Sequence, residues 1–136
     1  MEGCMIELTV PSAHYMMLVI RLTTSGVLAR SGLTVDAMED VKMAAEEACN
    51  CLMRSSGCAR IHVRYLLEAE RFRLHAEAAG CENCANVVSP DEIDVIRCVL
   101  MSMVDDVQLT YEGRRLRGVE LVKRLPSADT THDGKQ

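Results

Sequence analysis

The spacing of apolar side chains changes several times along this chain, and each change marks a separate strand or helix. Between residues 4 and 10 the apolar side chains fall close to a period of two, which predicts a first strand that Pro11 closes. From Ser12 the period lengthens to that of a helix, which we expect to end at Gly32 because glycine often follows the last helical turn. The apolar residues with helical spacing are Tyr15, Leu18, Val19, Leu22, Val27 and Leu28.

A second helix is expected after Thr34, whose side chain is suited to cap the first turn. Asp36 places a negative charge in that turn, where the helix dipole favours it. The helix should end in the run Ser55-Ser56-Gly57. Its apolar side chains fall on one inward face, and they are Met38, Val41, Ala45, Ala48, Cys49 and Leu52.

A hairpin and a third helix follow. Alternating apolar residues in 61–65 and 72–78 predict two paired strands, joined by a polar turn at 68–71. The run Ser89-Pro90-Asp91-Glu92 combines a capping box with a proline at the first helical position. This run predicts the start of a helix that continues to Met103.

A final hairpin from 107–111 and 116–123, turned at 112–113, completes the order β-α-α-β-β-α-β-β. This order indicates an α+β, two-layer sandwich in which helices cover one face of a mixed or antiparallel sheet. The apolar content falls sharply near the end of the sequence. We therefore expect one domain over residues 1–125 and a disordered tail over 126–136.

Composition then narrows the class of protein. The 136 residues are 49% apolar, enough for one globular domain with its own core. The net charge of −5 gives no electrostatic reason to expect direct contact with nucleic acid. A helix needs about 20 apolar residues to span a membrane, and the apolar runs of this chain are shorter. The first residues also lack the basic segment of a signal peptide. Seven cysteines, an odd number, suit a reducing compartment, so we expect a cytoplasmic protein without a membrane partner.

The first half of the chain carries a run of local features that occur together in one known family. The stretch from Ile6 to Met53 closely resembles the amino-terminal half of the RsbW and SpoIIAB anti-sigma factors. In the second half, Val104-Asp105-Asp106-Val107 resembles the family's Met-Asp-Glu-Val. The features of the first half are the strand ending in Val-Pro, Arg-Leu-Thr at 21–23, Ser-Gly-Val at 25–27, and Glu-Asp-Val-Lys-x-Ala followed by Glu-Ala-Cys within 39–49.

The resemblance implies a fold, an activity and a set of partners. Members of this family are serine protein kinases on the GHKL, or histidine kinase-like ATPase, fold. They sequester a sigma factor, are displaced by a STAS-type anti-anti-sigma factor, and commonly form homodimers. For this chain the same fold, the same two partner classes and a homodimer are therefore expected from the resemblance.

The resemblance also locates a magnesium site, which departs from the family pattern. Family members carry a glutamate that acts as general base and, four residues later, an asparagine whose oxygen holds Mg²⁺. Glu47 stands at the base position, but Cys51 stands where the asparagine belongs. The nearest asparagine, Asn50, is about 100° away around the helix. Because Mg²⁺ prefers hard oxygen ligands, the cysteine is a poor replacement.

Two further nucleotide-binding elements also differ from the family pattern in ways that should weaken nucleotide binding. The family's Asp-x-Gly-x-Gly turn, whose aspartate reads the adenine amino group, is represented by Ala78 and Gly80, with the aspartate lost. An unmatched donor costs about 1 to 3 kcal/mol, which is about ten- to hundredfold in affinity. The family's Gly-x-Gly, which wraps the phosphates, aligns with residues 94–97, where side chains and the negative charge of Asp94 oppose close approach.

Arg21 is the candidate partner-binding residue. It lies in the Arg-Leu-Thr that matches the family, and the resemblance places the corresponding arginine on the face that engages both partner classes. Interfaces favour arginine for its planar fork of donors. A solvated arginine paired with a nearby acid is an equally good interpretation of the same residue.

The cysteines allow a separate hypothesis. Cys81-Glu-Asn-Cys84 has the two-residue spacing of zinc and thiol-redox sites, and the family template places it near Cys51. A structural zinc needs four ligands, and His62 and His75 fall on strand positions that face away from the apolar side. The simpler interpretation is that these cysteines are small buried side chains of the core or an exposed thiol in a loop. The nine methionines, among them Met16, Met17, Met101 and Met103, suit the core or an adaptable interface and do not indicate a cofactor.

The sequence therefore favours a regulatory binding protein that resembles anti-sigma factors, has lost or weak ATP binding, and needs no cofactor. An active ATP-dependent serine kinase that uses Glu47 and Asn50 with Mg²⁺ is the main alternative. A thiol or metal sensor built on the same scaffold, through Cys51, Cys81 and Cys84, is a third.

Overall fold

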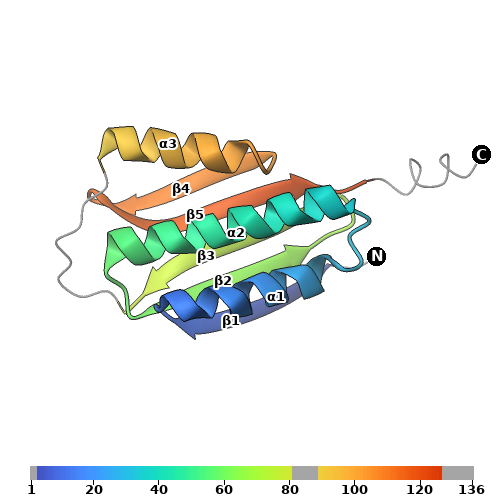
Figure 1. Cartoon of the computed structure of the whole chain (residues 1–136), viewed down its shortest axis with the longest axis horizontal. Coiled ribbons are helices and arrows are strands. Elements are labelled where there is room, and N and C mark those ends of the chain that lie inside the picture. Colours follow the sequence, from blue (N-terminus) through green and yellow to red (C-terminus); the bar gives the residue numbers. More distant parts are fainter. Residues whose placement is uncertain (1–2, 81–88, 127–136) are drawn as a thin grey trace, which may run out of the picture.

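The computed structural model describes residues 3–80 and 89–126, and these form a sheet with helices on one of its faces (Figure 1). The strands are β1 (Cys4–Pro11), β2 (Arg60–Leu67), β3 (Arg71–Ala79), β4 (Asp106–Glu112) and β5 (Arg115–Arg124). The helices are α1 (Met17–Leu28), α2 (Val35–Ser56) and α3 (Pro90–Met101), with a short 3-10 turn, His14–Met16, before α1.

The sheet that the described residues form contains five strands in the order β1-β2-β3-β5-β4. Each neighbouring pair is antiparallel, with Val10 opposite Ile61 in the first pair and a register shift at Thr110/Tyr111 in the last. The α+β class predicted from the sequence is confirmed. Of the two sheet types that the sequence left open, the chain forms the antiparallel one.

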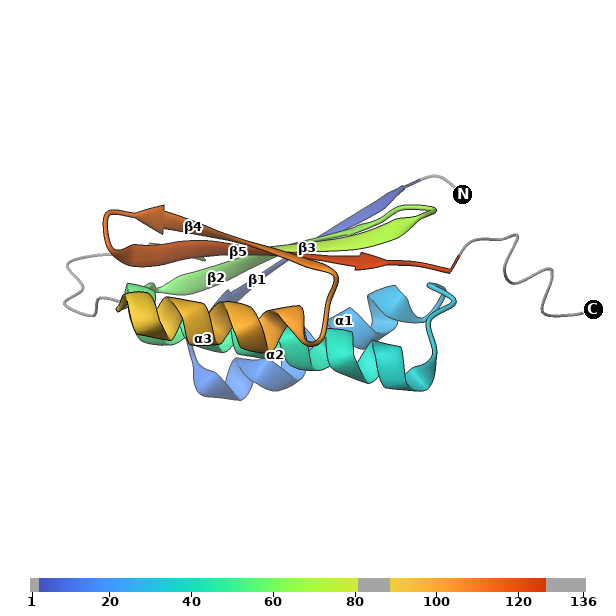
Figure 2. The same ribbon diagram turned by 90° about the horizontal axis from the view of Figure 1, so that it is seen from above.

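The described helices lie together on one face of the sheet (Figure 2). α2 runs between α1 and α3 (Figure 1) and packs on β3 and β5. α1 packs on β2 and α2, while α3 contacts β4 and α2. α2 is therefore flanked by α1 on one side and by α3 on the other, and the face of α2 that points away from the sheet lies between these two helices.

The core lies between this helical layer and the sheet. α2 turns small side chains toward the strands, with Ala44, Ala45 and Ala48 fully buried, so the helix approaches the sheet closely. Tyr65 and Phe72 fill the sheet side of the same cluster. The predicted inward face of α2 is confirmed, with Met38 half-buried and the rest fully buried, namely Val41, Ala45, Ala48, Cys49 and Leu52.

Helix boundaries follow the capping signals at some ends and differ at others. The side chain of Thr34 accepts a hydrogen bond from the amide of Ala37 at 3.1 Å, and Ser89 accepts one from the amide of Glu92 at 3.2 Å, as predicted. α1 ends at Leu28, before the predicted Gly32. Gly32 has a φ of 82°, so it belongs to the turn between α1 and α2.

One side of α1, together with the short 3-10 turn before it, carries large apolar side chains that face solvent. Tyr15 and Leu22 are 72% and 62% exposed, and Leu18 is 57% exposed. With Val19 they form a helical set at i, i+3, i+4 and i+7, here named the α1 stripe. The opposite side of the helix is buried through Ile20, Thr24 and Leu28.

Within the described residues, no helix combines the length and apolar character needed to cross a membrane. The predicted tail over 126–136 falls outside the described residues from position 127 onward.

Candidate functional site

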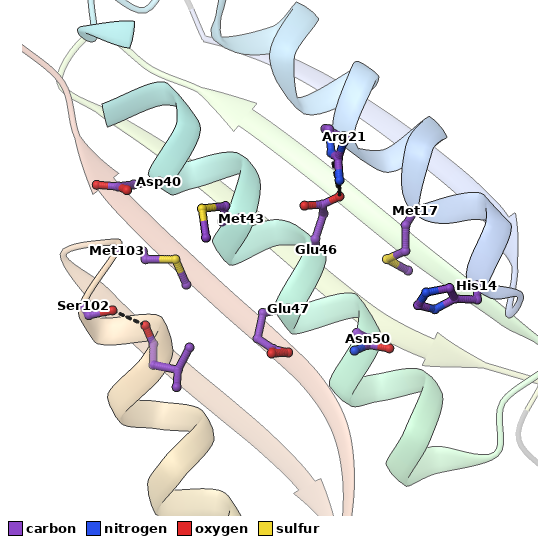
Figure 3. Close-up of a pocket in the computed structure, with 11 residues that line it drawn as sticks. His14, Met17, Arg21, Asp40, Met43, Glu46, Glu47, Asn50, Ser102 and Met103 are labelled. Carbon is purple, nitrogen blue, oxygen red and sulfur yellow. Dashed lines mark hydrogen bonds and ion pairs between the residues drawn. The ribbon is translucent and has the colours of Figure 1, made fainter. Parts of the chain in front are cut away.

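A cleft of about 660 Å³ opens on the outward face of α2, between α1 and the end of α3 (Figure 3). We name it the α2 cleft. Its lining side chains come from all three helices and from the short segments next to them. They are His14, Met17, Arg21, Asp40, Met43, Glu46, Glu47, Asn50, Val99, Ser102 and Met103.

The floor of the cleft follows from the helical repeat of α2. Asp40, Met43, Glu47 and Asn50 succeed one another at spacings of three and four, so they share one face of the helix. The opposite face is held against the sheet by the buried alanines described above. The sequence of α2 therefore fixes which side chains are presented to the cleft.

Glu47 and Asn50, the predicted base and the displaced asparagine, line the same cleft and are both half-buried. The structure therefore brings these two predicted residues together. Cys51, one position further along α2, is only 1% exposed and belongs to the core cluster. Asn50 and Cys51 therefore point in different directions, as expected for adjacent residues of a helix.

Cys51 is held inside the fold by two polar neighbours. Its thiol donates a long hydrogen bond to Glu47 Oε2 at 3.9 Å, and Arg54 Nη2 donates to its Sγ at 3.3 Å. Burial raises the pKa of the Cys51 thiol, the Arg54 hydrogen bond lowers it, and the Glu47 charge raises it, with a net upward shift. A neutral buried thiol offers no oxygen ligand of the kind that Mg²⁺ prefers.

Ala78 and Gly80 lie at the end of β3 and are not among the described residues that line the α2 cleft. Ala78 is half-buried, packs against the core cluster and stands opposite Ile61. Gly80 has a φ of 68°, and a Cβ there would lie 3.0 Å from that of Ala59. Glycine at 80 is therefore required by the backbone of this turn, independently of any ligand.

Arg21 forms an ion pair across the helix interface. Its Nη2 lies 2.5 Å from Glu46 Oε1, and its Nε donates to the same oxygen at 2.7 Å, which ties α1 to α2 (Figure 3). The pairing with a nearby acid, one of the two interpretations of Arg21, is what the structure contains. The side chain is still 52% exposed, so the partner-binding role stays a prediction.

The proposed cysteine site cannot be assembled from the residues that the structure describes. Cys81 and Cys84 lie in 81–88, outside the described residues. Among residues 3–80 and 89–126, no group of three or more metal-ligating side chains comes together. His62 and His75 lie on the predicted face of the sheet, away from the helices, near carboxylates of Glu7 and Glu120 respectively.

Sequence patterns did not point to the remaining cleft residues. The mixed polar and apolar outer face of α2 was a usable signal, since Asp40 and Met43 share the spacing of Glu47. The contributions of α1 and α3 depend on how the helices pack, which local spacing does not determine. The residues missed were His14, Met17, Asp40, Met43, Glu46, Val99, Ser102 and Met103.

Comparison with known proteins supports a relationship to RsbW over part of the chain. The serine-protein kinase RsbW of Halalkalibacterium halodurans is 50% identical over 44 residues, which is 32% of this chain and 27% of that protein. RsbW of Bacillus subtilis is 50% identical over 44 residues, covering 28% of its length, and RsbW of Staphylococcus aureus strain Newman is 49% identical over 43 residues. The match thus spans little more than a quarter of these relatives. No protein-family model matches the chain.

Proposed function

We propose that this chain is a cytoplasmic regulatory binding protein related to RsbW, built on the GHKL fold, with lost or weak ATP binding and no resident cofactor. The partial identity to RsbW supports the relationship. The antiparallel sheet with helices on one face is consistent with the fold that the resemblance implies. The loss of nucleotide binding is supported by the local chemistry of two residues.

The observation that carries the proposal is the placement of Cys51. A metal ligand at this position would have to reach solvent and offer an oxygen, whereas Cys51 is 1% exposed and its sulfur is engaged by Glu47 and Arg54. Filling the position with a neutral thiol removes a hard ligand from the magnesium site that the family uses. Without the metal, a triphosphate approaching Glu47 meets an uncompensated carboxylate.

Ala78 supports the same conclusion at the adenine end. Its half-buried methyl group cannot accept a hydrogen bond from an adenine amino group. A buried donor left without a partner costs about 1 to 3 kcal/mol. Two independent substitutions, one for the metal and one for the base, therefore both weaken nucleotide binding.

An active serine kinase is the alternative, and one observation favours it. Glu47 and Asn50 line the same cleft, so a general base and an amide oxygen are available together. The cleft also holds Asp40, whose negative charge opposes a polyphosphate, while the charge of Glu46 is balanced by its ion pair with Arg21. We therefore keep the binding protein as the main proposal.

Calorimetric titration with Mg-ATP and Mg-ADP separates the two functions. The proposal predicts no saturable heat for the wild-type protein up to millimolar nucleotide, about the weak limit of a useful site. Glu47→Ala and Asn50→Ala are the matched variants. Saturable wild-type binding that either variant abolishes would contradict the proposal and favour the kinase.

The proposed partners are a sigma factor and a STAS-type anti-anti-sigma factor, with a second copy of the chain completing a homodimer. The α1 stripe supports the homodimer, because large apolar side chains that are exposed side by side favour burial against another surface. A protein that does not use ATP also lacks the switch in which phosphorylation of the antagonist ends its binding. Release of the partner would then depend on competition and concentration.

A further inference from the structure

The α2 cleft combines apolar and acidic groups in a regular order. Asp40, Met43 and Glu47 follow one another along a single face of α2 at spacings of three and four. The two carboxylates are therefore about 10 Å apart along the helix axis, with the methionine between them. Met43 is 56% exposed, so this ridge faces solvent with an apolar centre and two acidic ends.

The flanking helices extend the apolar part of the cleft on both sides. Met17 contributes from α1, while Val99 and Met103 contribute from α3 and the segment after it. Figure 3 shows Met43 and Met103 turned toward the same part of the cleft. Methionine side chains are flexible and polarizable, so they adapt to the shape of an apolar group laid between them.

The charges of the cleft are only partly balanced by its own residues. Glu46 is neutralised by the ion pair with Arg21. Asp40 and Glu47 form no ion pair with any residue in 3–80 or 89–126, and Glu47 receives only the weak thiol hydrogen bond from Cys51. In the part of the chain that the structure describes, the cleft therefore holds two carboxylates without an ion-pair partner, at either end of an apolar strip.

We propose that the α2 cleft is the docking groove for a cationic amphipathic helix of a partner protein. The apolar face of that helix would pack on Met43 and its methionine neighbours. Two Lys or Arg side chains about two turns apart would pair with Asp40 and Glu47, matching the spacing of the carboxylates. This inference rests on the proposed function as a protein-binding regulator, and it specifies the chemistry of the bound segment.

The chain's own exposed apolar face does not fit this groove. The α1 stripe consists of Tyr15, Leu18, Val19 and Leu22, and it supplies no cations two turns apart. The adjacent cation on α1, Arg21, is already paired with Glu46. The α1 stripe of a second copy therefore offers no complement for Asp40 and Glu47, whereas a basic amphipathic helix does.

Fluorescence anisotropy with a designed peptide tests the groove directly. The probe is a labelled helical peptide of about four turns, with leucines on one face and lysines two turns apart beside them. A second probe carries glutamate in place of each lysine. We expect saturable binding of the basic peptide that weakens with added salt, and no binding of the acidic peptide.

Two pairs of variants distinguish binding in the groove from nonspecific electrostatic or hydrophobic binding elsewhere on the surface. Asp40→Lys combined with Glu47→Lys should weaken the basic peptide about tenfold or more, whereas Glu70→Lys, in the exposed β2–β3 turn, should have little effect. Met43→Gln should weaken it about fivefold, whereas Met101→Gln, a similarly exposed methionine outside the cleft, should not. Circular dichroism and thermal unfolding verify that each variant is folded.

No binding of the basic peptide, equal binding of both peptides, or equal effects of the cleft variants and their controls would each overturn the docking groove. These outcomes leave the proposed function standing, because the peptide measurement involves neither nucleotide nor dimer formation. Conversely, clear Mg-ATP binding in the calorimeter would contradict the proposed loss of nucleotide binding without affecting the peptide result.

Discussion

At the scale of single residues, a shift of one position along α2 separates a core side chain from a cleft side chain. Asn50 lines the cleft, while Cys51 is buried beside Glu47 and Arg54. The angular separation was predictable from the sequence, because it follows from the helical repeat. The contacts of Cys51 were not, because they depend on how α2 packs against the sheet.

Two buried groups make the stability of the fold depend on pH. Burial raises the pKa of the Cys49 thiol from 9.0 to about 12, and burial raises the pKa of Tyr65 from 10.0 to about 12. The Tyr65 hydroxyl forms a hydrogen bond with the Thr24 hydroxyl, at 2.9 Å, inside the core. Both groups therefore stay protonated in the folded protein at pH values where the unfolded chain has lost these protons.

Below about pH 9, these two groups should not change the free energy of unfolding with pH. Above about pH 9, the free energy of unfolding should fall as the pH rises. The expected slope is about 1.4 kcal/mol per pH unit for each group above its unfolded pKa. Urea denaturation at about pH 7 and about pH 10.5 measures this. Cys49→Ala should flatten the part of the slope that begins near pH 9, and equal wild-type stabilities at both pH values would contradict the burial of these groups.

At the scale of elements, strands and caps were predictable where local chemistry determines them. Ser89 caps α3 and Gly113, with a φ of 65°, turns the last hairpin, because each residue type is suited to that backbone geometry. α1 is different, since apolar residues lie on more than one of its faces. The spacing therefore predicted a helix without identifying which side is buried, and the structure assigns burial to Ile20, Thr24 and Leu28.

The α1 stripe leads to a prediction about oligomeric state. Leu18→Asp combined with Leu22→Asp should convert the proposed homodimer to a monomer, because burying one leucine is worth about 1.5 to 3 kcal/mol and a two-fold interface counts each change twice. The expected weakening is at least about a hundredfold. Sedimentation velocity measures the mass of the particle in solution.

Val95→Asp is the matched control, since Val95 is also exposed, at 61%, but lies on α3. It should leave the association unchanged. A wild-type monomer, or a dimer unaffected by the paired substitution in α1, would show that the α1 stripe is not the contact between copies.

At the scale of the whole molecule, the candidate site arises from the packing of three helices over one antiparallel sheet. Residues from position 14 to position 103 meet in the α2 cleft, and only the tertiary arrangement brings them together. The sequence singled out Glu47 and Asn50 as candidate site residues but did not connect them with Met17 or Met103, which come from other helices or the segments next to them. The similarity to RsbW covers 32% of the chain, so the rest of the function is argued from local chemistry.

The central claim is that the fold is retained while the nucleotide site is not, and a crystal structure grown with Mg²⁺ and a nonhydrolysable ATP analogue tests it most directly. The account predicts no electron density for nucleotide or metal around Glu47, Cys51 and Ala78. The Cys51 thiol should still contact Arg54. Ordered purine density beside Ala78, with a metal ion held by Asn50 or Glu47, would contradict the account.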